Sequence, residues 1–148
     1  MHFSRSNQKA LLEAATSPTN AQGWSDNAIA FGISHEPKGD LIGVMVFDEF
    51  RGREAELAIA MFNERPLTLT IIEAIKQLAF HPRFLGLGAL WARIAHDDRR
   101  ALSAAIRCGF EVEYRRRAGY AGGKDAIMLS MTAPATPPED RASAQDEV

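Results

Sequence analysis

Glu56 is the residue of this sequence best suited to acid–base chemistry. It is the one polar residue in the run 55–62, and all the remaining side chains of that run are hydrophobic. Burial among apolar side chains raises the pKa of a carboxyl group, and a carboxylate so placed can take a proton from a nucleophile through a water molecule. The alternative interpretation is structural, because an ion pair with Arg53 or Arg93 would also account for an acid in this stretch.

Two other side chains could also transfer protons. His96 follows the apolar segment 88–95 and is either a second candidate for the base or a polar residue that closes a strand before an aspartate cap. Tyr120 lies in the glycine-rich stretch A-G-Y-A-G-G-K. It would act as an acid only if that loop folded over the site, and otherwise its ring simply packs on the surface.

Arg115, Arg116 and Arg117 form the densest basic cluster. Alternation along a strand would place Arg115 and Arg117 on one face and Arg116 on the other. The cluster either binds a phosphate or acidic partner or is the solvated end of a strand. Cys108 is interpreted as a small buried residue, because the sequence supplies no specific base beside it.

The composition is that of a single soluble domain. The chain has 148 residues, of which 46% are hydrophobic and 24% charged. One cysteine excludes an internal disulfide, and four scattered histidines lack the spacing of metal ligands, so no metal is expected. There is no apolar run of about 18 residues and no secretory signal pattern, so we expect an intracellular, cytoplasmic protein that does not enter a membrane.

The net charge of −2 is unevenly distributed. Residues 132–148 are rich in proline and alanine and carry a net charge of −3, which leaves +1 for residues 1–131. The sequence therefore predicts a domain over 1–131 and an acidic tail over 132–148, either solvated or a partner-binding peptide. Neither charge favours binding to nucleic acid.

The hydrophobic pattern predicts the elements that must position these residues. Three strands joined by short turns are expected to form an antiparallel meander, at 28–35, 41–47 and 55–62. Helical spacing predicts a helix over 66–80, with Pro66 in its first turn and Thr70 and Glu73 as a capping box, and then a strand over 88–95. Ser6 offers half of a capping box to a short helix over 6–15.

Asp97 or Asp98 is expected to cap the next helix, which ends at Gly109, and strands at 110–116 and 126–131 complete the domain. The succession of strand, helix and strand over 55–95 implies a parallel crossover within an otherwise antiparallel sheet. The predicted fold class is therefore α+β, a three-layer domain whose mixed sheet has one parallel strand pair and helices on both faces.

Specific stretches resemble a known family. D-D-R-R-A-L-S-A-A-I-R-C-G-F (97–110) is similar to the signature N-x-x-A-x-x-x-Y-x-x-x-G-F of the GNAT N-acetyltransferase superfamily, with matches at Ala101, Gly109 and Phe110. L-I-G-V-M-V-F-D (41–48) and A-E-L-A-I-A (55–60) resemble its third and fourth strands. The resemblance covers about residues 28–131 and extends to the short GNAT-like proteins of phages and prophages.

This resemblance implies transfer of an acetyl group from acetyl-CoA to an amine. In the family the fourth and fifth strands splay apart, the pantetheine arm enters between them, and the pyrophosphate rests at the start of the next helix. The positions that correspond in this sequence are Ala60, Met61, Arg65, Leu67, Thr68, Thr70 and Asp98.

The sequence departs from the family pattern at three places. The stretch 63–70 contains no glycine, whereas the family's pyrophosphate loop is glycine-rich, and Pro66 removes one amide donor. Asp98 stands where the family often has asparagine, and its charge would repel a phosphate. Ala105 stands where the family has the tyrosine that acts as general acid.

Two hypotheses follow. The first is an acetyl-CoA-dependent N-acetyltransferase that acts on a small-molecule or protein amine, with Glu56 or His96 as base. The second is a catalytically inert GNAT-fold protein of a phage, either virion-associated or involved in assembly, whose partners would be phage structural proteins or further copies of itself.

Overall fold

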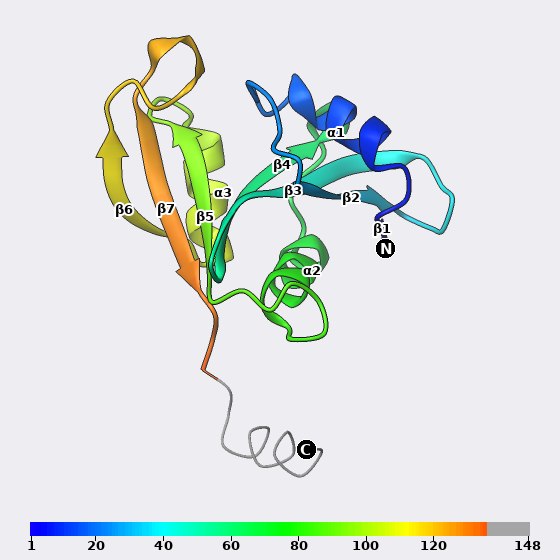
Figure 1. Ribbon diagram of the computed structural model, residues 1–148. Helices are drawn as coiled ribbons and strands as arrows, with labels where there is room; N and C mark the ends of the chain where they lie inside the picture. Colours follow the sequence, from blue (N-terminus) through cyan, green and yellow to red (C-terminus); the bar gives the residue numbers. More distant parts are fainter. Residues whose placement is uncertain (136–148) are drawn as a thin grey trace.

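The computed structural model describes residues 1–135, and within them seven strands form one mixed sheet in the order β1-β2-β3-β4-β5-β7-β6 (Figure 1). The strands are β1 His2–Ser4, β2 Ile29–Ser34, β3 Leu41–Arg51, β4 Glu54–Met61, β5 Ala89–Ala95, β6 Glu111–Arg116 and β7 Ala126–Thr132. The helices are α1 Gln8–Thr16, α2 Leu69–Phe80 and α3 Arg99–Cys108. The β4–β5 pair is parallel and the other pairs are antiparallel, which confirms the predicted fold class.

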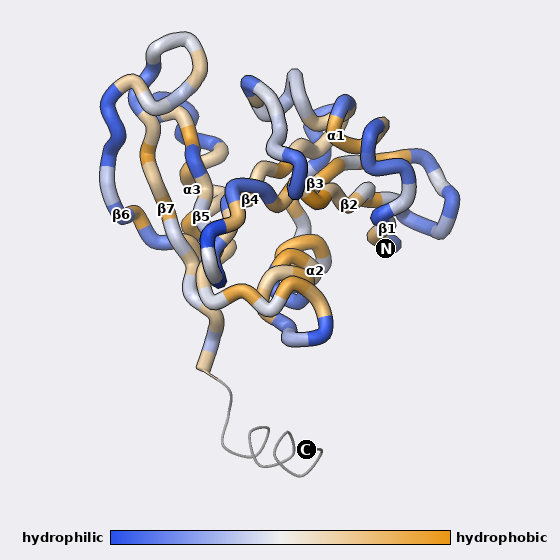
Figure 2. The backbone as a smooth tube through the Cα atoms, viewed as in Figure 1, coloured by the Kyte–Doolittle hydropathy of each residue, from blue (hydrophilic) through white to orange (hydrophobic). Residues whose placement is uncertain are grey.

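β3 runs through the centre of the fold and is buried on both faces. Val44 and Val46 pack with Leu11 and Ala15 of α1, while Met45 and Phe47 belong to the larger core formed with α2 and α3. Figure 2 shows hydrophobic residues gathered where the sheet meets its helices. Helices therefore cover both faces of the sheet, as the alternation along each strand requires.

Both ends of α3 follow from local chemistry. Asp98 is the N-cap of α3, because its Oδ1 accepts a hydrogen bond of 3.1 Å from the amide of Ala101. Gly109 ends the same helix with φ of 107°, a conformation that favours glycine. Of the two aspartates expected to cap α3, Asp98 is therefore the one that does so.

Two predicted caps were wrong. Thr70 lies inside α2, whose N-cap is Thr68, because Thr68 has the extended backbone that a cap needs and its Oγ1 accepts from the amide of Ile71 at 3.3 Å. Ser6 does not cap α1, since the N-cap position belongs to Asn7, which has a left-handed backbone and no capping side-chain hydrogen bond.

The strand β1 was missed by the sequence analysis. It has three residues and pairs antiparallel with β2, with Phe3 opposite Ile33. Three residues are too few to show the alternation that identifies a strand, so its position depends on the tertiary pairing alone. The predicted tail begins at residue 132, but Thr132 still belongs to β7, and residues 136–148 lie outside the described range.

β4 and β5 diverge after a short common start. Their paired residues are Glu54 with Ala89, Ala55 with Leu90 and Glu56 with Trp91. Beyond this point β4 stays with β3 as far as Met61, whereas β5 stays with β7 as far as Ala95. The sheet therefore opens into two arms, β1–β4 and β5–β7–β6, as Figure 1 shows. None of the helices in residues 1–135 is long and apolar enough to cross a membrane.

We expect Gly43→Ala to destabilise the β3–β4 pair. A Cβ atom on Gly43 would lie 2.7 Å from the carbonyl oxygen of Ala60 and 2.8 Å from Sδ of Met61. Overpacking of this kind costs about 1–3 kcal/mol in the free energy of unfolding. Gly88→Ala is the matched control, because its nearest contact would be 3.7 Å. Urea denaturation measures both variants, and equal stabilities would contradict this account.

Candidate functional site

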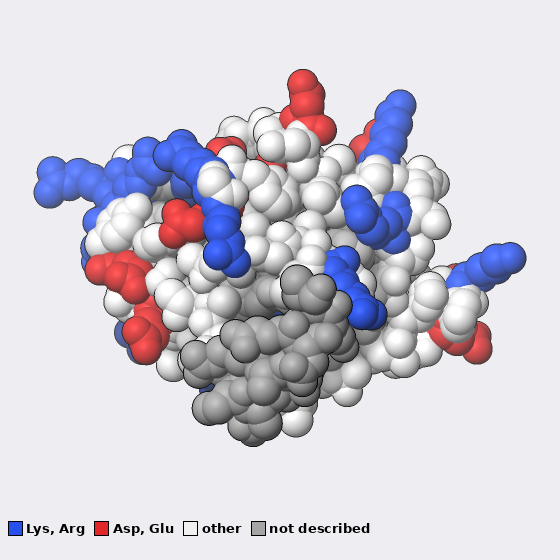
Figure 3. Space-filling view, turned by 60° about the horizontal axis from the view of Figure 1, so that its bottom comes forward, with Lys and Arg blue, Asp and Glu red and all other residues white. Residues whose placement is uncertain are grey.

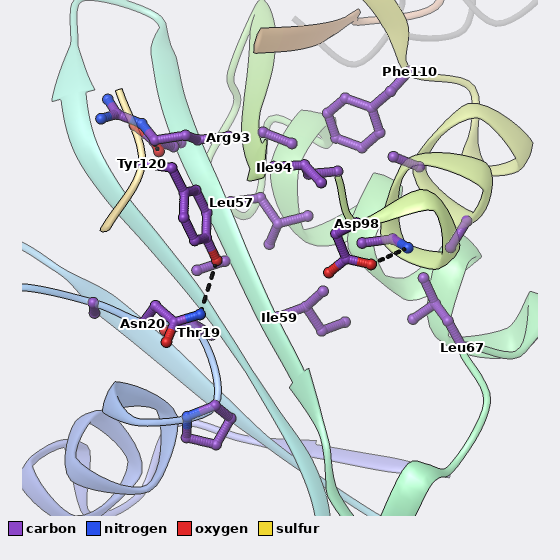
Figure 4. A pocket seen from close by; sticks show the side chains of 18 of the residues that line it. Thr19, Asn20, Leu57, Ile59, Leu67, Arg93, Ile94, Asp98, Phe110 and Tyr120 are labelled. Carbon is purple, nitrogen blue, oxygen red and sulfur yellow. Dashed lines mark hydrogen bonds and ion pairs between the residues drawn. The ribbon is translucent and has the colours of Figure 1, made fainter. Parts of the chain in front are cut away.

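A cleft of about 940 Å³ opens where β4 and β5 separate. We call it the β4–β5 cleft. Its walls come from β4, β5 and α3, and its mouth is formed by the loops after α1, β4 and β6. Figure 4 shows apolar side chains from several elements directed into it, namely Leu57, Ile59, Leu67, Ile94 and Phe110. An opening with apolar side chains between two strand edges suits an extended ligand with an apolar arm.

Glu56 lies on the wall of the cleft and, with Trp91, forms the last residue pair that joins β4 to β5. Its side chain is 24% exposed, and Oε1 lies 3.3 Å from Nε of Arg93. Burial raises the pKa of Glu56; the Arg93 guanidinium opposes that rise, while the charges of Glu49 and Asp48 add to it. Both interpretations of Glu56 therefore have a basis, since it is a cleft carboxylate with a raised pKa and also the partner of an arginine.

Arg93 links β5 to the loop that follows β6. Its Nη1 donates a hydrogen bond of 3.0 Å to the carbonyl oxygen of Gly119. Its buried Nε is close to Glu56 but makes no hydrogen bond within the described residues. The guanidinium thus holds the residue before Tyr120 while it balances the charge of Glu56.

Tyr120 reaches across the mouth of the cleft. Its hydroxyl accepts a hydrogen bond of 3.1 Å from Nδ2 of Asn20, in the loop after α1 (Figure 4). The glycine-rich loop therefore does fold over the site, which is the condition that the sequence analysis set for Tyr120 to act as an acid. Because Asn20 is the donor, the hydroxyl proton of Tyr120 is not used in this bond. Asn20 lies 100 positions away in the sequence, and no local signal identifies it.

His96 lies outside the cleft lining. Its backbone amide donates to the carbonyl oxygen of Asp125 at 3.0 Å, and its Nδ1 is 3.2 Å from the same oxygen. The half-buried side chain follows the end of β5, beside the start of β7. The structure thus brings Glu56 and Tyr120 to the cleft and does not bring His96 with them.

The residues matched to cofactor positions divide into two groups. Those that line the β4–β5 cleft are Met61, Arg65, Leu67 and Asp98. Those that do not are Ala60, Thr68 and Thr70. Ala60 is buried, Thr68 uses its hydroxyl as the cap of α2, and Thr70 is exposed on that helix.

The loop between β4 and α2 takes a glycine-like conformation without glycine. Asn63 and Glu64 both have a left-handed backbone, with φ of 55° and 56°. This conformation is costly for residues with a side chain, and asparagine tolerates it better than most. Arg65, the next residue, lines the cleft and has its Nη1 3.3 Å from Nε2 of His35. A basic residue thus lines the cleft in the loop that leads into α2.

Asp48 is a site residue that the sequence analysis missed. It is 6% exposed, lies opposite Glu56 across the β3–β4 pair, and accepts hydrogen bonds from the amide of Ser25, at 3.1 Å, and from the Ser25 hydroxyl. Asp48 and Glu49 both line the cleft. The signal available in the sequence was an acid that directly follows the apolar run 41–47. Together with Glu56 these residues make this part of the cleft acidic.

Cys108 lines the β4–β5 cleft as a buried thiol, whereas Arg115, Arg116 and Arg117 lie outside its lining. Burial raises the pKa of the Cys108 thiol, so the thiolate is disfavoured, as expected of a buried cysteine. Arg115 belongs to β6, the strand of the β5–β7–β6 arm that lies farthest from β4. Its Nε is 2.8 Å from Oδ2 of Asp125. Within residues 1–135, no group of three or more His, Cys, Asp or Glu side chains is placed to hold a metal ion.

The fold is that of the GNAT N-acetyltransferases. Neither a family model nor a curated protein matches the sequence. Solved structures of the spermidine N-acetyltransferase SpeG from Vibrio cholerae do share the fold. One mutant form gives a TM-score of 0.71 at 16% identity, covering 90% of this chain and 95% of that chain. Another pair of mutant forms gives 0.64 at 20% identity, with coverages of 73% and 69%. A structure described as dodecameric gives 0.62 at 20% identity, with coverages of 73% and 67%.

Glu49→Gln and Arg93→Gln should shift the pKa of Glu56 in opposite directions. Removing the charge of Glu49 lowers the pKa, whereas removing the guanidinium of Arg93 raises it further. Carbon-13 NMR titration of the carboxyl groups measures both shifts. Glu73→Gln, on the surface of α2, serves as a control that should leave Glu56 unchanged. A lower Glu56 pKa in Arg93→Gln would contradict the electrostatic account.

Proposed function

We propose that this protein is an acetyl-CoA-dependent N-acetyltransferase. The observation that carries the proposal is the divergence of β4 and β5 into a cleft with Glu56 at its inner end. The likeness to spermidine N-acetyltransferases supports it through the fold. The proposed reaction takes place in the cytoplasm of the cell that makes the protein.

The cleft residues are suited to acetyl-CoA. Leu57, Ile59 and Leu67 offer an apolar path for the pantetheine arm, and the free edges of the two arms offer backbone groups to it. Arg65 is placed to pair with the pyrophosphate at the mouth, beside the start of α2. When bound, acetyl-CoA supplies the activated acyl group, and the narrow end of the cleft near Glu56 is where the acceptor would meet it.

The acceptor we infer is a cationic amine, either a small molecule or a protein side chain. Asp48, Glu49 and Glu56 give one end of the cleft a negative charge that attracts an ammonium group. Amines react only in the neutral form, so the same end must also remove a proton. Glu56 is suited to that step, because burial brings its pKa closer to neutrality.

The proposed chemistry needs one base and one acid. The amine nitrogen bonds to the acyl carbon as the carbon–sulfur bond breaks, and the surplus amine proton passes to Glu56, directly or through water. The departing thiolate takes a proton from the hydroxyl of Tyr120. Asn20 favours this donation, because its hydrogen bond to the phenol oxygen stabilises the phenolate that forms. Arg93 holds both partners, through Glu56 on one side and Gly119 on the other.

A second candidate function rests on the charges near the cofactor path. Asp98 lines the cleft with a carboxylate, and the hydroxyl of Thr68 is already used as a cap. Both features oppose phosphate binding and favour an inert GNAT-fold protein of a phage particle, associated with virion components or with further copies of itself. The two functions differ in whether acetyl-CoA binds at all.

Binding of acetyl-CoA is expected to raise the melting temperature of the wild-type chain, because a ligand of the native state stabilises it. Ala104→Trp should weaken this binding at least about tenfold, since Ala104 lines the cleft and an indole would fill it. Ser103→Trp is the matched control, exposed on the same helix and outside the cleft. Calorimetry measures the affinities. Absence of any heat or melting shift at millimolar acetyl-CoA would exclude the enzyme and leave the inert alternative.

Glu56→Gln should lower turnover of an amine panel by about 10²–10⁴-fold while acetyl-CoA binding persists, because only the base is lost. Glu54→Gln, at the exposed start of the same strand, should retain activity. The base works as a carboxylate, so wild-type kcat/KM should fall as the pH drops through a pKa above the ordinary value of a glutamate. Full activity of Glu56→Gln would refute its role as the base.

A further inference from the structure

Two loops meet across the mouth of the β4–β5 cleft, one from each arm of the sheet. The loop after α1 belongs to the β1–β4 arm, because α1 packs on Val44 and Val46 of β3. The loop after β6 belongs to the β5–β7–β6 arm. The hydrogen bond from Nδ2 of Asn20 to the hydroxyl of Tyr120 joins the two loops at 3.1 Å (Figure 4). It therefore links the arms independently of the three residue pairs that β4 and β5 share.

Asn20 occupies a position at which glycine is usual. The chain leaves α1 through two backbone hydrogen bonds, from the amide of Asn20 to the carbonyl oxygen of Ser17, at 3.1 Å, and from the amide of Ala21 to that of Thr16, at 3.0 Å. This pair is the Schellman pattern, whose left-handed residue is most often glycine. Asn20 takes that conformation, with φ of 56°. The turn itself thus needs no side chain here, and the side-chain amide of Asn20 is left for its contact with Tyr120.

The loop after α1 is fixed to its own arm at two further points. The indole Nε1 of Trp24 donates hydrogen bonds to the carbonyl oxygen of Leu12, at 3.1 Å, and to Oγ1 of Thr16, at 3.0 Å. The amide of Ser25 donates to Oδ2 of the buried Asp48 at 3.1 Å. The position of this loop is therefore set by contacts with α1 and β3, and does not depend on the loop that it meets.

The loop after β6 is held at its base in the same way. The amide of Ala118 donates to Oδ1 of Asp125 at 2.9 Å, and the amide of Tyr120 donates to the carbonyl oxygen of Lys124 at 2.9 Å. The guanidinium of Arg93 adds its hydrogen bond from β5. Because both loops are fixed to their arms, the hydrogen bond between them determines how wide the cleft is open at this point.

We propose that Asn20 and Tyr120 form a clasp that narrows the entrance to Glu56 and restricts the acceptor to amines on a slender chain. Residues 18–24 and 118–122 line the cleft, so an acceptor on its way to Glu56 passes beside the clasp. A slender chain passes while the clasp is closed, whereas a wide group requires its hydrogen bond to break. Asn20 is thereby a specificity-determining residue. This inference rests on the proposed N-acetyltransferase function.

Two diamines of equal charge test the specificity of the full-length chain. Hexamethylenediamine is slender, whereas the trans para isomer of bis(aminomethyl)cyclohexane has a ring in a chain with as many carbons between its amines. Wild type should favour hexamethylenediamine, and Asn20→Gly should reduce the ratio of the two kcat/KM values about threefold to tenfold, the net worth of one hydrogen bond. Any effect of the variant on proton donation by Tyr120 applies to both amines, so the ratio isolates the clasp.

Two further variants separate the clasp from other effects. Asn20→Asp should keep the wild-type preference, because its carboxylate accepts a hydrogen bond from the hydroxyl of Tyr120 and aspartate tolerates a left-handed backbone. Gln22→Gly is the matched control, since it also replaces an amide side chain by glycine in the same loop and in the lining of the same cleft. It should keep the wild-type preference because Gln22 does not belong to the clasp.

Limited proteolysis measures the clasp without acetyl-CoA or an amine. Figure 3 shows Lys and Arg side chains gathered along the left-hand edge of the molecule, where β6 lies, and Arg117 is exposed just before the loop. Trypsin should cleave after Arg117 about threefold to tenfold faster in Asn20→Gly than in wild type, because the loop opens more often. Gln22→Gly and Asn20→Asp should be cleaved at the wild-type rate. Circular dichroism confirms that each variant is folded.

The outcomes distinguish the clasp from the enzyme. Equal use of both diamines by wild type, turnover of other amines but of neither diamine, or an unchanged preference in Asn20→Gly would overturn the specificity role while acetyl-CoA still binds. Absence of acetyl-CoA binding would remove the enzyme and the acceptor assignment together, and the trypsin rates would then decide on the clasp alone. Equal cleavage of wild type and Asn20→Gly would overturn the clasp itself.

Discussion

The short pairing of β4 with β5 is the constraint on which the rest of the structure depends. Only three residue pairs join the two strands, and each strand then follows a different neighbour. The strands remain ordered without each other because β3 and β7 pair with them along their whole remaining length. Two strand edges are consequently left facing a cleft inside a well-packed sheet. Leu57 and Ile59 from one arm and Ile94 from the other line that cleft, so its walls are continuous with the core that stabilises the fold.

The electrostatics of the cleft centre on one partly compensated carboxylate. Burial and two neighbouring acids raise the pKa of Glu56, and Arg93 limits the rise. Arg93 also bonds to Gly119, and the adjacent Tyr120 bonds to Asn20. A chain of polar contacts therefore crosses the opening from β4 through β5 and the loop after β6 to the loop after α1. The charge of Glu56 and the position of the loop that carries Tyr120 are coupled through the guanidinium group of Arg93.

The departures from the family pattern have a structural counterpart. The loop after β4 has a left-handed backbone at Asn63 and Glu64 although it lacks glycine. Thr68 and Asp98 serve as helix caps, a role that local chemistry fully explains. Ala105 and Tyr120 both line the cleft, and Tyr120 reaches it from the loop after β6.

Local patterns were sufficient for most of the fold, because alternation, helical spacing and turn residues report on neighbours in the chain. They located the central strands, the Asp98 cap and the stop at Gly109, and they singled out Glu56 as an acid among apolar residues. They also found α2, although it begins at Leu69 and the predicted start at residue 66, with Pro66 in the first turn, was wrong. They misplaced the cap of α2, where Thr68 and Thr70 are chemically alike and backbone conformation decides between them. Which groups meet at the site was settled only by the tertiary structure. Asn20 and Tyr120, or Asp48 and Glu56, come together through long-range strand pairing and loop packing, and no spacing within a single segment encodes those contacts.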